Sequence, residues 1–305
     1  WYHVRPHSQG SIRLKTLRDA IRQKDFVITA DLPLSPTTTA EDIESAAAEL
    51  RTVVDAVQIV DDREASGHMS SLAAAAIAMR AGVDPVLHLT ARDRNRIALQ
   101  AELLGAAALG LTSLVISRGE KLSKKEFLRG KGVFDTNEAR FMGMARRIGE
   151  ETGLVSPPGF LLGTYVTVFA PADNWQAKRI GESLDTGVNV LYTQPCLNTR
   201  LLGLYMKKLV EKKILHRASV IVEVPLLDSR ESARDYKKAN PIALLPDATV
   251  KRIAEADDPV ATGFAACVEM LREARTVPGI AGVTIRHTGS AQKVVAAVEA
   301  AGLAS

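Results

Sequence analysis

The feature that most constrains the fold is a repeated alternation of short apolar runs with longer segments of helical period. Eight short runs, rich in β-branched and aliphatic residues, recur along the 305-residue chain: Phe26–Leu32, Val54–Val60, Pro85–Thr90, Ser113–Ser117, Leu162–Phe169, Val188–Thr193, Ser219–Val224 and Ala281–Ile285. The segments between them are amphipathic and often Ala-rich: Ala40–Arg51, Ser70–Ala81, Arg94–Leu109, Asn137–Glu151, Gln176–Thr186, Thr199–Lys213 and Ala261–Ala274. This alternation indicates βα units and a parallel sheet covered by helices.

The number of units favours a closed barrel over an open sheet. Eight βα units match a (β/α)8 TIM barrel, whereas open doubly wound sheets usually have roughly five or six strands. No linker is long or polar enough to divide the chain, and we interpret Lys121–Gly132 as a long βα loop. We therefore predict one α/β domain, a (β/α)8 barrel over residues 12–305. Residues 1–11 are interpreted as a tail left by processing or expression.

Composition excludes several classes of protein. With 39 Lys+Arg against 35 Asp+Glu, the net charge of +4 is too mild to indicate a nucleic-acid partner. No apolar run reaches the ~18–20 residues of a membrane helix, so we expect no membrane partner. Cys196 and Cys267 are too few for a disulfide framework or a Cys-rich zinc site, which fits a reducing cytoplasm.

In a barrel of this kind, the polar residues at the carboxyl ends of the strands are the candidates for function. Reading those ends in order gives Asp31, Asp61, Asp62, His88, Thr90, Arg118, Gly119, Glu120, Gln194 and Arg286. Strand ends also meet solvent, so each residue taken singly is equally well explained as a solvated turn residue.

Local spacing adds detail at three strands. His88 and Thr90 share one face of their strand, and an isolated histidine is often a hydrogen-bonded core residue rather than a base. In Arg118-Gly119-Glu120 the glycine permits close approach of backbone to a ligand, although a plain turn with a surface ion pair explains the motif as well. Gln194 offers both a donor and an acceptor, suited to an amide-like heterocycle edge.

Other chemistries lack support in the sequence. Cys196 has no nearby histidine to activate it as a nucleophile. No HxxxH, CxxC or carboxylate triplet has metal-ligand spacing, and no GxGxxG follows a strand. The segment Lys121–Lys131 holds five cations and one carboxylate. It is interpreted either as a solvated loop or as a contact for phosphate or carboxylate groups.

The segment Val86–Glu120, VLHLTARDRNRIALQAELLGAAALGLTSLVISRGE, resembles the signature stretch of the methylenetetrahydrofolate reductase family. The resemblance extends over residues 12–303 and includes FVITADLPLSP at Phe26–Pro36, Val133-Phe134-Asp135, DTGVNVLYTQP at Asp185–Pro195 and the segment Val277–Val283.

This resemblance implies a flavoprotein that passes hydride from NADH or NADPH through FAD to 5,10-methylenetetrahydrofolate, or runs in reverse, in a homo-oligomer. It implies that Asp31 is the proton donor to the folate and that Glu120 is the carboxylate near the flavin. Flavin contacts would come from His88, Thr90, Arg118, Gly119 and Phe134, and folate contacts from Gln194 and Arg286.

The sequence departs from the family pattern in two places. Asp31 stands where the family has glutamate, and Glu120 stands where it has aspartate, so the two carboxylates exchange lengths. A shorter loop carries Ser183 at the position of the family's FAD-binding lysine, and Lys178 and Arg179 are the candidate substitutes. Two alternatives therefore remain: a flavin-independent reductase with direct hydride transfer, and a non-catalytic folate-binding barrel.

Overall fold

Eight parallel strands close into a barrel in a computed structural model that describes residues 14–61, 67–119, 131–152, 159–239, 242–287 and 289–304. The strand order around the barrel follows the chain, from β1 next to β2 through to β8, which pairs with β1 again. The strands are β1 (Val27–Asp31), β2 (Ala56–Ile59), β3 (Pro85–Thr90), β4 (Ser113–Ser117), β5 (Leu161–Val166), β6 (Val188–Thr193), β7 (Ser219–Pro225) and β8 (Ile280–Arg286).

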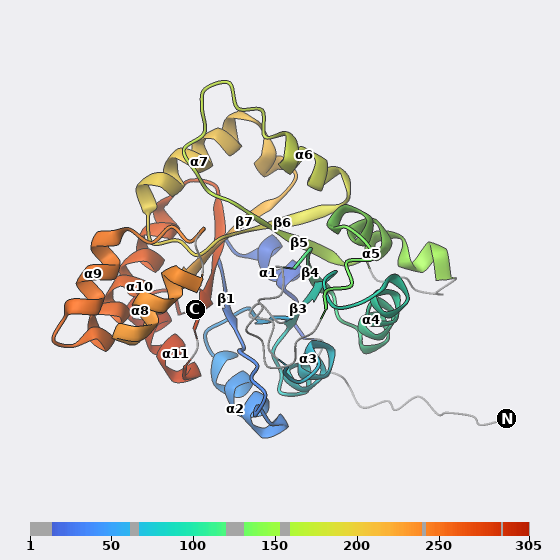
Figure 1. Cartoon of the computed structure of the whole chain (residues 1–305), viewed down its shortest axis with the longest axis horizontal. Helices are drawn as coiled ribbons and strands as arrows, with labels where there is room; N and C mark the ends of the chain where they lie inside the picture. The colour runs from blue at the N-terminus through green and yellow to red at the C-terminus, as the bar shows by residue number, and fades with distance from the viewer. Residues whose placement is uncertain are drawn as a thin grey trace.

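Helices surround the strands in Figure 1, as expected when each crossover returns over the outside of the barrel. They are α1 (Leu17–Gln23), α2 (Ala40–Leu50), α3 (Ser71–Arg80), α4 (Arg96–Leu109), α5 (Glu138–Thr152), α6 (Lys178–Asp185), α7 (Thr199–Glu211), α8 (Arg230–Ala239), α9 (Asp247–Glu255), α10 (Pro259–Thr276) and α11 (Ala291–Ala300). All eight predicted strands and all seven predicted helices are confirmed, with ends that coincide or differ by a few residues.

The helix ends are set by local hydrogen bonds. The side chain of Thr39 accepts from the backbone of Asp42, whose carboxylate binds back in a capping box that starts α2. The side chain of Asn95 caps α4 in the same position, which explains why that helix begins after Arg94 rather than at it. Arg94 is thereby left in the loop, where its side chain takes part in the site described below.

Each strand divides its side chains between two cores. Outward residues such as Leu87 and Leu89 of β3 pack under the surrounding helices in the large cluster. Inward residues such as Val27, Val86 and Ile221 form a second cluster inside the barrel. Alternation along a strand therefore shows which side chains point toward the barrel axis.

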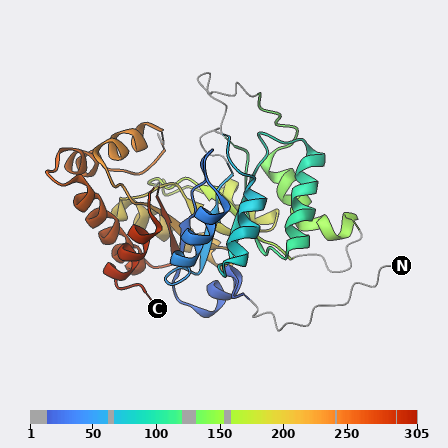
Figure 2. The ribbon, with the colours of Figure 1, turned by 90° about the horizontal axis from the view of Figure 1, so that it is seen from below.

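Helix α1, which the sequence did not predict, closes the amino-terminal end of the barrel. Leu17 and Ala20 are fully buried and belong to the inner cluster. In Figure 2 this dark blue helix lies below the barrel, whereas α8 and α9 lie toward the upper side. Asp84, just before β3, accepts a 2.7 Å hydrogen bond from the amide of Leu17. A site can therefore form at the opposite end of the barrel, where the strands have their carboxyl ends.

Between β7 and β8 the chain forms three helices instead of one. Helices α8 and α9 bring a small apolar cluster of their own, which includes Leu227, Ala233 and Ile253, and α10 then packs against the barrel. Its first turn is capped by Asp258 and contains Pro259. Among the described residues, no helix is long and apolar enough to cross a membrane. Residues 1–11 lie outside the described part of the chain.

Candidate active site

Near the carboxyl ends of the strands, the interior of the barrel is lined by polar side chains from most of the strands. Because Val27, Ala56, Val86 and Ile221 face inward, the residues two positions further along each strand face inward as well. These inward residues at the carboxyl end include Thr29, Asp31, Gln58, His88, Tyr192, Glu223, Thr284 and Arg286. The predicted residues Asp31, His88 and Arg286 are thus brought to the same end of one barrel.

A hydrogen-bond network occupies the β1–β2–β3–β6 side of this interior. Gln58 Nε2 donates to Thr29 Oγ1 at 3.1 Å and lies 3.4 Å from the Tyr192 hydroxyl. Thr29 Oγ1 donates to the Val283 carbonyl, so it accepts from Gln58, and this fixes the orientation of the amide. Gln58 Oε1 therefore faces His88 Nε2 at 2.7 Å as an acceptor, and Nε2 of His88 carries the hydrogen.

Two tyrosines complete this network. The ring of Tyr165 lies between His88 and Tyr192, with centroid distances of 6.2 and 6.1 Å. Burial raises the pKa of Tyr192, so its hydroxyl stays protonated. His88 is consequently held by a hydrogen bond inside the barrel, which agrees with the interpretation of this histidine as a hydrogen-bonded core residue. A role in binding flavin stays a prediction.

Asp31 stands at the end of β1 with only 4% of its surface exposed. Its carbonyl is bound by His287 Nε2 at 2.9 Å, and His287 Nδ1 lies 3.0 Å from the carbonyl of Gly289. The β8–α11 connection therefore fixes the backbone that carries the Asp31 carboxylate. His287 was not predicted, because nothing in the sequence shows that it reaches back to the first strand.

A buried ion pair occupies the β7–β8 side. Glu223 is 1% exposed, and its Oε1 accepts from Arg286 Nη1 at 3.2 Å. The Arg286 guanidinium also lies 5.0 Å from the centre of the Tyr236 ring on α8. Thr284 faces Glu223 in the β7–β8 register. Glu223 was not predicted as a site residue. The signal in the sequence was a carboxylate within the otherwise apolar run SVIVEV.

Asp61, just after β2, links the carboxyl ends of β2 and β3 by hydrogen bonds. Its carboxylate is bound by both terminal nitrogens of Arg94, at 2.6 and 3.1 Å, and by the amide of Thr90 at 2.9 Å. A paired, hydrogen-bonded carboxylate with 4% exposure is a rigid structural junction. Thr90 is therefore near the mouth, held through its backbone. Asp62 lies outside the described residues.

The β4 end brings Gly119 against the β3–α4 loop. Gly119 has φ +80°, and a Cβ built on it would lie 2.8 Å from Cβ of Arg92, so the position requires glycine. Arg92 is fully buried and forms a bidentate pair with Asp93. The guanidinium of Arg118 lies 5.1 Å from the ring of Phe134. Glu120, Lys124 and Lys125 lie outside the described residues.

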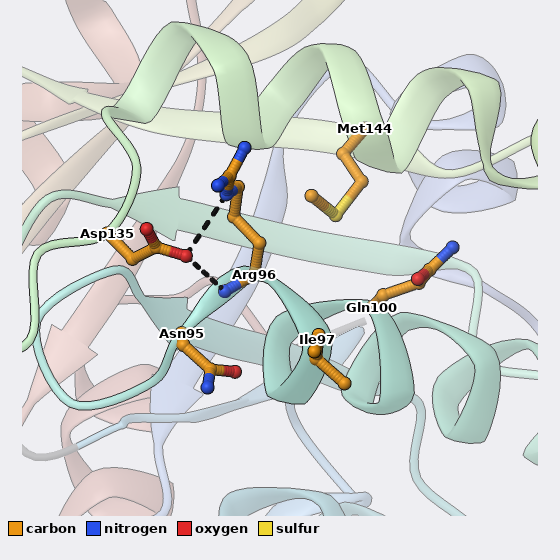
Figure 3. Close-up of a pocket in the computed structure, with 6 residues that line it drawn as sticks. All are labelled: Asn95, Arg96, Ile97, Gln100, Asp135 and Met144. Atoms are coloured by element: carbon orange, nitrogen blue, oxygen red, sulfur yellow. Dashed lines mark hydrogen bonds and ion pairs between the residues drawn. The ribbon is translucent and has the colours of Figure 1, made fainter.

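The Phe134 segment is anchored on the flank of the barrel. Asp135 Oδ2 accepts from both the amide and Nε of Arg96, each at 3.0 Å, as Figure 3 shows. These hydrogen bonds, first that from the Arg96 backbone, lower the pKa of Asp135. A cavity of about 320 Å³ beside them is lined by α4 and α5 residues, among them Gln100 and Met144. It lies outside the ring of inward-facing residues.

The predicted substitutes for the FAD-binding lysine are not brought to the inward-facing group. Lys178 and Arg179 are exposed on α6, and Lys178 lies 4.0 Å from Glu182 on the same helix. The preceding loop packs on α7 instead, where Trp175 lies 5.8 Å from the ring of Tyr205. The hydroxyl of Ser183 donates to the carbonyl of Arg179 within α6.

Gln194 is buried and its amide is engaged by the β5–α6 loop. Its Oε1 accepts from the amide of Val168 at 2.7 Å, and its Nε2 donates to the carbonyl of Val168 at 3.0 Å. One donor and one acceptor position remain on this amide. The proposed contact of Gln194 with folate stays a prediction.

In the described part of the chain, the two cysteines are not activated as nucleophiles and no metal site is found. Burial raises the pKa of Cys196 to about 11 and that of Cys267 to about 12. Both thiols are therefore protonated at neutral pH. Within the described ranges, no group of three or more His, Cys, Asp or Glu residues is arranged to hold a metal ion.

The fold and this ring of polar side chains define a (β/α)8 barrel protein with its candidate site at the carboxyl ends of the strands. The family model of methylenetetrahydrofolate reductase matches residues 16–299, and the chain belongs to that family.

Among solved structures, the chain is similar to an uncharacterized protein from Clostridium thermocellum that binds two copies of 5-methyl-5,6,7,8-tetrahydrofolic acid. The TM-score is 0.64 at 12% sequence identity, over 93% of this chain and 97% of that one, a likeness that concerns the fold alone. A comparison with curated proteins finds no match.

Proposed function

We propose that this barrel reduces 5,10-methylenetetrahydrofolate to 5-methyltetrahydrofolate, or catalyses the reverse oxidation, with NADH or NADPH as the hydride partner. The observation that carries the proposal is the buried, inward-facing Asp31 at the mouth of a barrel that belongs to the reductase family. Buried carboxyl groups at such positions are suited to hold and deliver a proton.

The proposed step balances as one proton and one hydride added to the substrate. Asp31 donates a proton to N10 as the bond between N10 and the bridging carbon breaks. The hydride reaches that carbon, which becomes the N5-methyl group. His287 holds the backbone of Asp31, and the Thr29–Gln58–His88 network provides a fixed polar wall beside it. In this scheme the fixed wall keeps the substrate oriented, which is where much of the rate gain in such reactions arises.

FAD fits the described residues only in part. Arg118, Gly119 and Phe134 form one group that would meet the ring system of a flavin. The cations expected at the pyrophosphate, Lys178 and Arg179, instead face solvent on α6. No step of the proposed reaction is routed through FAD.

This placement favours a second form of the same function, in which hydride passes directly from the nicotinamide to the folate. The α6 cations and the packing of the β5–α6 loop on α7 are the specific observations in its support. The two forms share the substrate, the product and the role of Asp31. They differ in the colour of the purified protein and in the fate of the transferred hydrogen.

An activity assay of the purified protein tests the proposal. NADH oxidation that depends on 5,10-methylenetetrahydrofolate, with formation of 5-methyltetrahydrofolate, is the expected result. Flavin absorbance bands would identify the FAD-dependent form, and a colourless active protein the direct form. Folate binding with no turnover under either condition would refute the proposal and leave a folate-binding barrel.

A further inference from the structure

The β7–β8–β1 side of the barrel mouth differs in chemistry from the rest of the interior. The β2–β3–β6 side carries the hydrogen bonds that link Gln58 to Thr29, His88 and Tyr192. On the β7–β8–β1 side a carboxylate, Glu223, is buried to 1% exposure in contact with a guanidinium. Carboxylates are rarely buried without a function that needs their charge or a partner that offsets it.

The backbone of Glu223 is held on both sides, and its carboxylate is bound by Arg286. Its amide donates to Thr193 Oγ1 at 3.1 Å, and its carbonyl accepts from the amide of Cys196 at 2.8 Å. The β7–β8 register places Thr284 directly opposite. Glu223 is therefore a preorganised acceptor rather than a mobile surface group.

Thr284 supplies an independent sign of a ligand. Its Oγ1 is buried, the residue is 2% exposed, and no described residue offers this hydroxyl a hydrogen-bond partner. Buried hydroxyls in proteins nearly always have a partner. The hydroxyl lies in register between Glu223 on β7 and Thr29 on β1, so a polar group bound there would meet both the hydroxyl and the carboxylate.

Arg286 indicates which groups fit Glu223. A guanidinium offers N–H donors that match a carboxylate. The aminopyrimidinone edge of a pterin, formed by N3–H and the 2-amino group, is a cyclic guanidine with a similar pair of donors. Tyr236 holds the guanidinium of Arg286 at 5.0 Å from its ring, so the arginine has a second partner when it leaves the carboxylate.

The spacing of the two carboxylates fits the same ligand. Glu223 and Asp31 stand on strands that flank β8, so two interstrand spacings, roughly 10 Å, separate their backbones. Asp31 also lies two residues nearer the mouth than Thr29, which is level with Thr284. A pterin with its aminopyrimidinone edge at Glu223 would direct its bridging methylene toward Asp31.

We propose that Glu223 and Thr284 recognise the aminopyrimidinone edge of the pterin. The carboxylate accepts from N3–H and the 2-amino group, and the Thr284 hydroxyl donates to the C4 carbonyl. When folate binds, the guanidinium of Arg286 leaves Glu223 and remains over the Tyr236 ring, beside the folate. This assignment rests on the proposed folate function.

Titration calorimetry of the full chain with 5-methyltetrahydrofolate tests the assignment. Glu223→Gln should weaken binding by roughly 10- to 100-fold, because hydrogen bonds to a charged acceptor are lost. Thr284→Val should weaken it by roughly 5- to 10-fold, as expected for one neutral hydrogen bond. The matched control is Asp55→Asn, which removes a buried carboxylate paired with Lys24 before β2, at the other end of the barrel, and should leave affinity unchanged.

An analogue that lacks the 2-amino group gives a second readout that needs no variant. The unaltered protein should bind it roughly 10-fold or more weakly than 5-methyltetrahydrofolate, and Glu223→Gln should lose most of that preference. Equal affinity of Glu223→Gln and the unaltered protein, or no discrimination by the unaltered protein, would overturn the assignment. Tight, selective binding without turnover would refute the reductase function alone, and absence of folate binding would refute both.

Discussion

Substituting Asp84 with asparagine should remove much of the pH dependence of folding stability between pH 4 and pH 7. Asp84 lies where α1 closes the barrel, and its Oδ2 accepts from the amide of Leu17 at 2.7 Å. Burial, and to a smaller degree the charge of Asp19, raises the pKa of Asp84 from 3.8 to about 7. An uncharged carboxyl keeps the hydrogen bond without the cost of a buried charge.

The sign follows from proton linkage. Between pH 3.8 and pH 7 the folded protein holds the Asp84 proton and the unfolded chain releases it, so the free energy of unfolding falls as pH rises. The stabilisation that Asp84 contributes is complete below pH 3.8 and is lost above about pH 7. The difference between those pKa values corresponds to about 4 kcal/mol, which is the greatest destabilisation that this ionisation produces at alkaline pH.

Urea denaturation at pH 4.5, 6 and 8 measures this effect. Asp84→Asn should exceed the free energy of unfolding of the unaltered protein by only about 1 kcal/mol at pH 4.5 and by up to about 4 kcal/mol at pH 8. The surface control Asp185→Asn removes the negative charge from an exposed ion pair with Arg217 and should change stability by less than about 1 kcal/mol. A difference between Asp84→Asn and the unaltered protein that is the same at all three pH values would refute the reasoning.

Three further predictions concern residues that the sequence placed in the site. Gly119→Ala should destabilise the fold by about 1–3 kcal/mol in urea denaturation, because φ is +80° and the new Cβ would meet Arg92; a loss below about 0.5 kcal/mol would contradict this packing. The double variant Lys178→Ala, Arg179→Ala should retain the activity and any flavin content of the parent, since both side chains are exposed; loss of bound flavin would show that α6 holds the cofactor. Asp31→Asn should slow folate reduction by roughly 100- to 10,000-fold in steady-state assays while binding of 5-methyltetrahydrofolate persists, and unimpaired turnover would exclude Asp31 as the acid.

The barrel was predictable because its strands are encoded locally. Runs such as PVLHLT and SLVIS combine β propensity with near-continuous apolar character, and the strands β3 and β4 have the predicted ends. Helix α1 was not predictable in the same way. It has seven residues, and its burial depends on a barrel end that exists only after all eight strands have paired.

The site was predictable in position but only partly in its contacts. Strand ends placed Asp31 and Arg286 at one end of the barrel, since parallel strands end together. The partners of these residues are distant in sequence: Arg286 is bound by Glu223, and the carbonyl of Asp31 by His287. Periodicity shows that a side chain faces inward, but it does not show which of several inward groups it contacts. That depends on register around the barrel.

The central claim is that this barrel converts 5,10-methylenetetrahydrofolate to 5-methyltetrahydrofolate with hydride from a nicotinamide. The most direct measurement is mass spectrometry of the folate product. The purified protein is incubated anaerobically with 5,10-methylenetetrahydrofolate and with NADH or NADPH dideuterated at C4. The account predicts 5-methyltetrahydrofolate, with deuterium in its methyl group if hydride passes directly and with the label exchanged to solvent if it passes through FAD. Absence of 5-methyltetrahydrofolate with either nicotinamide, from protein that binds folate normally, would contradict it.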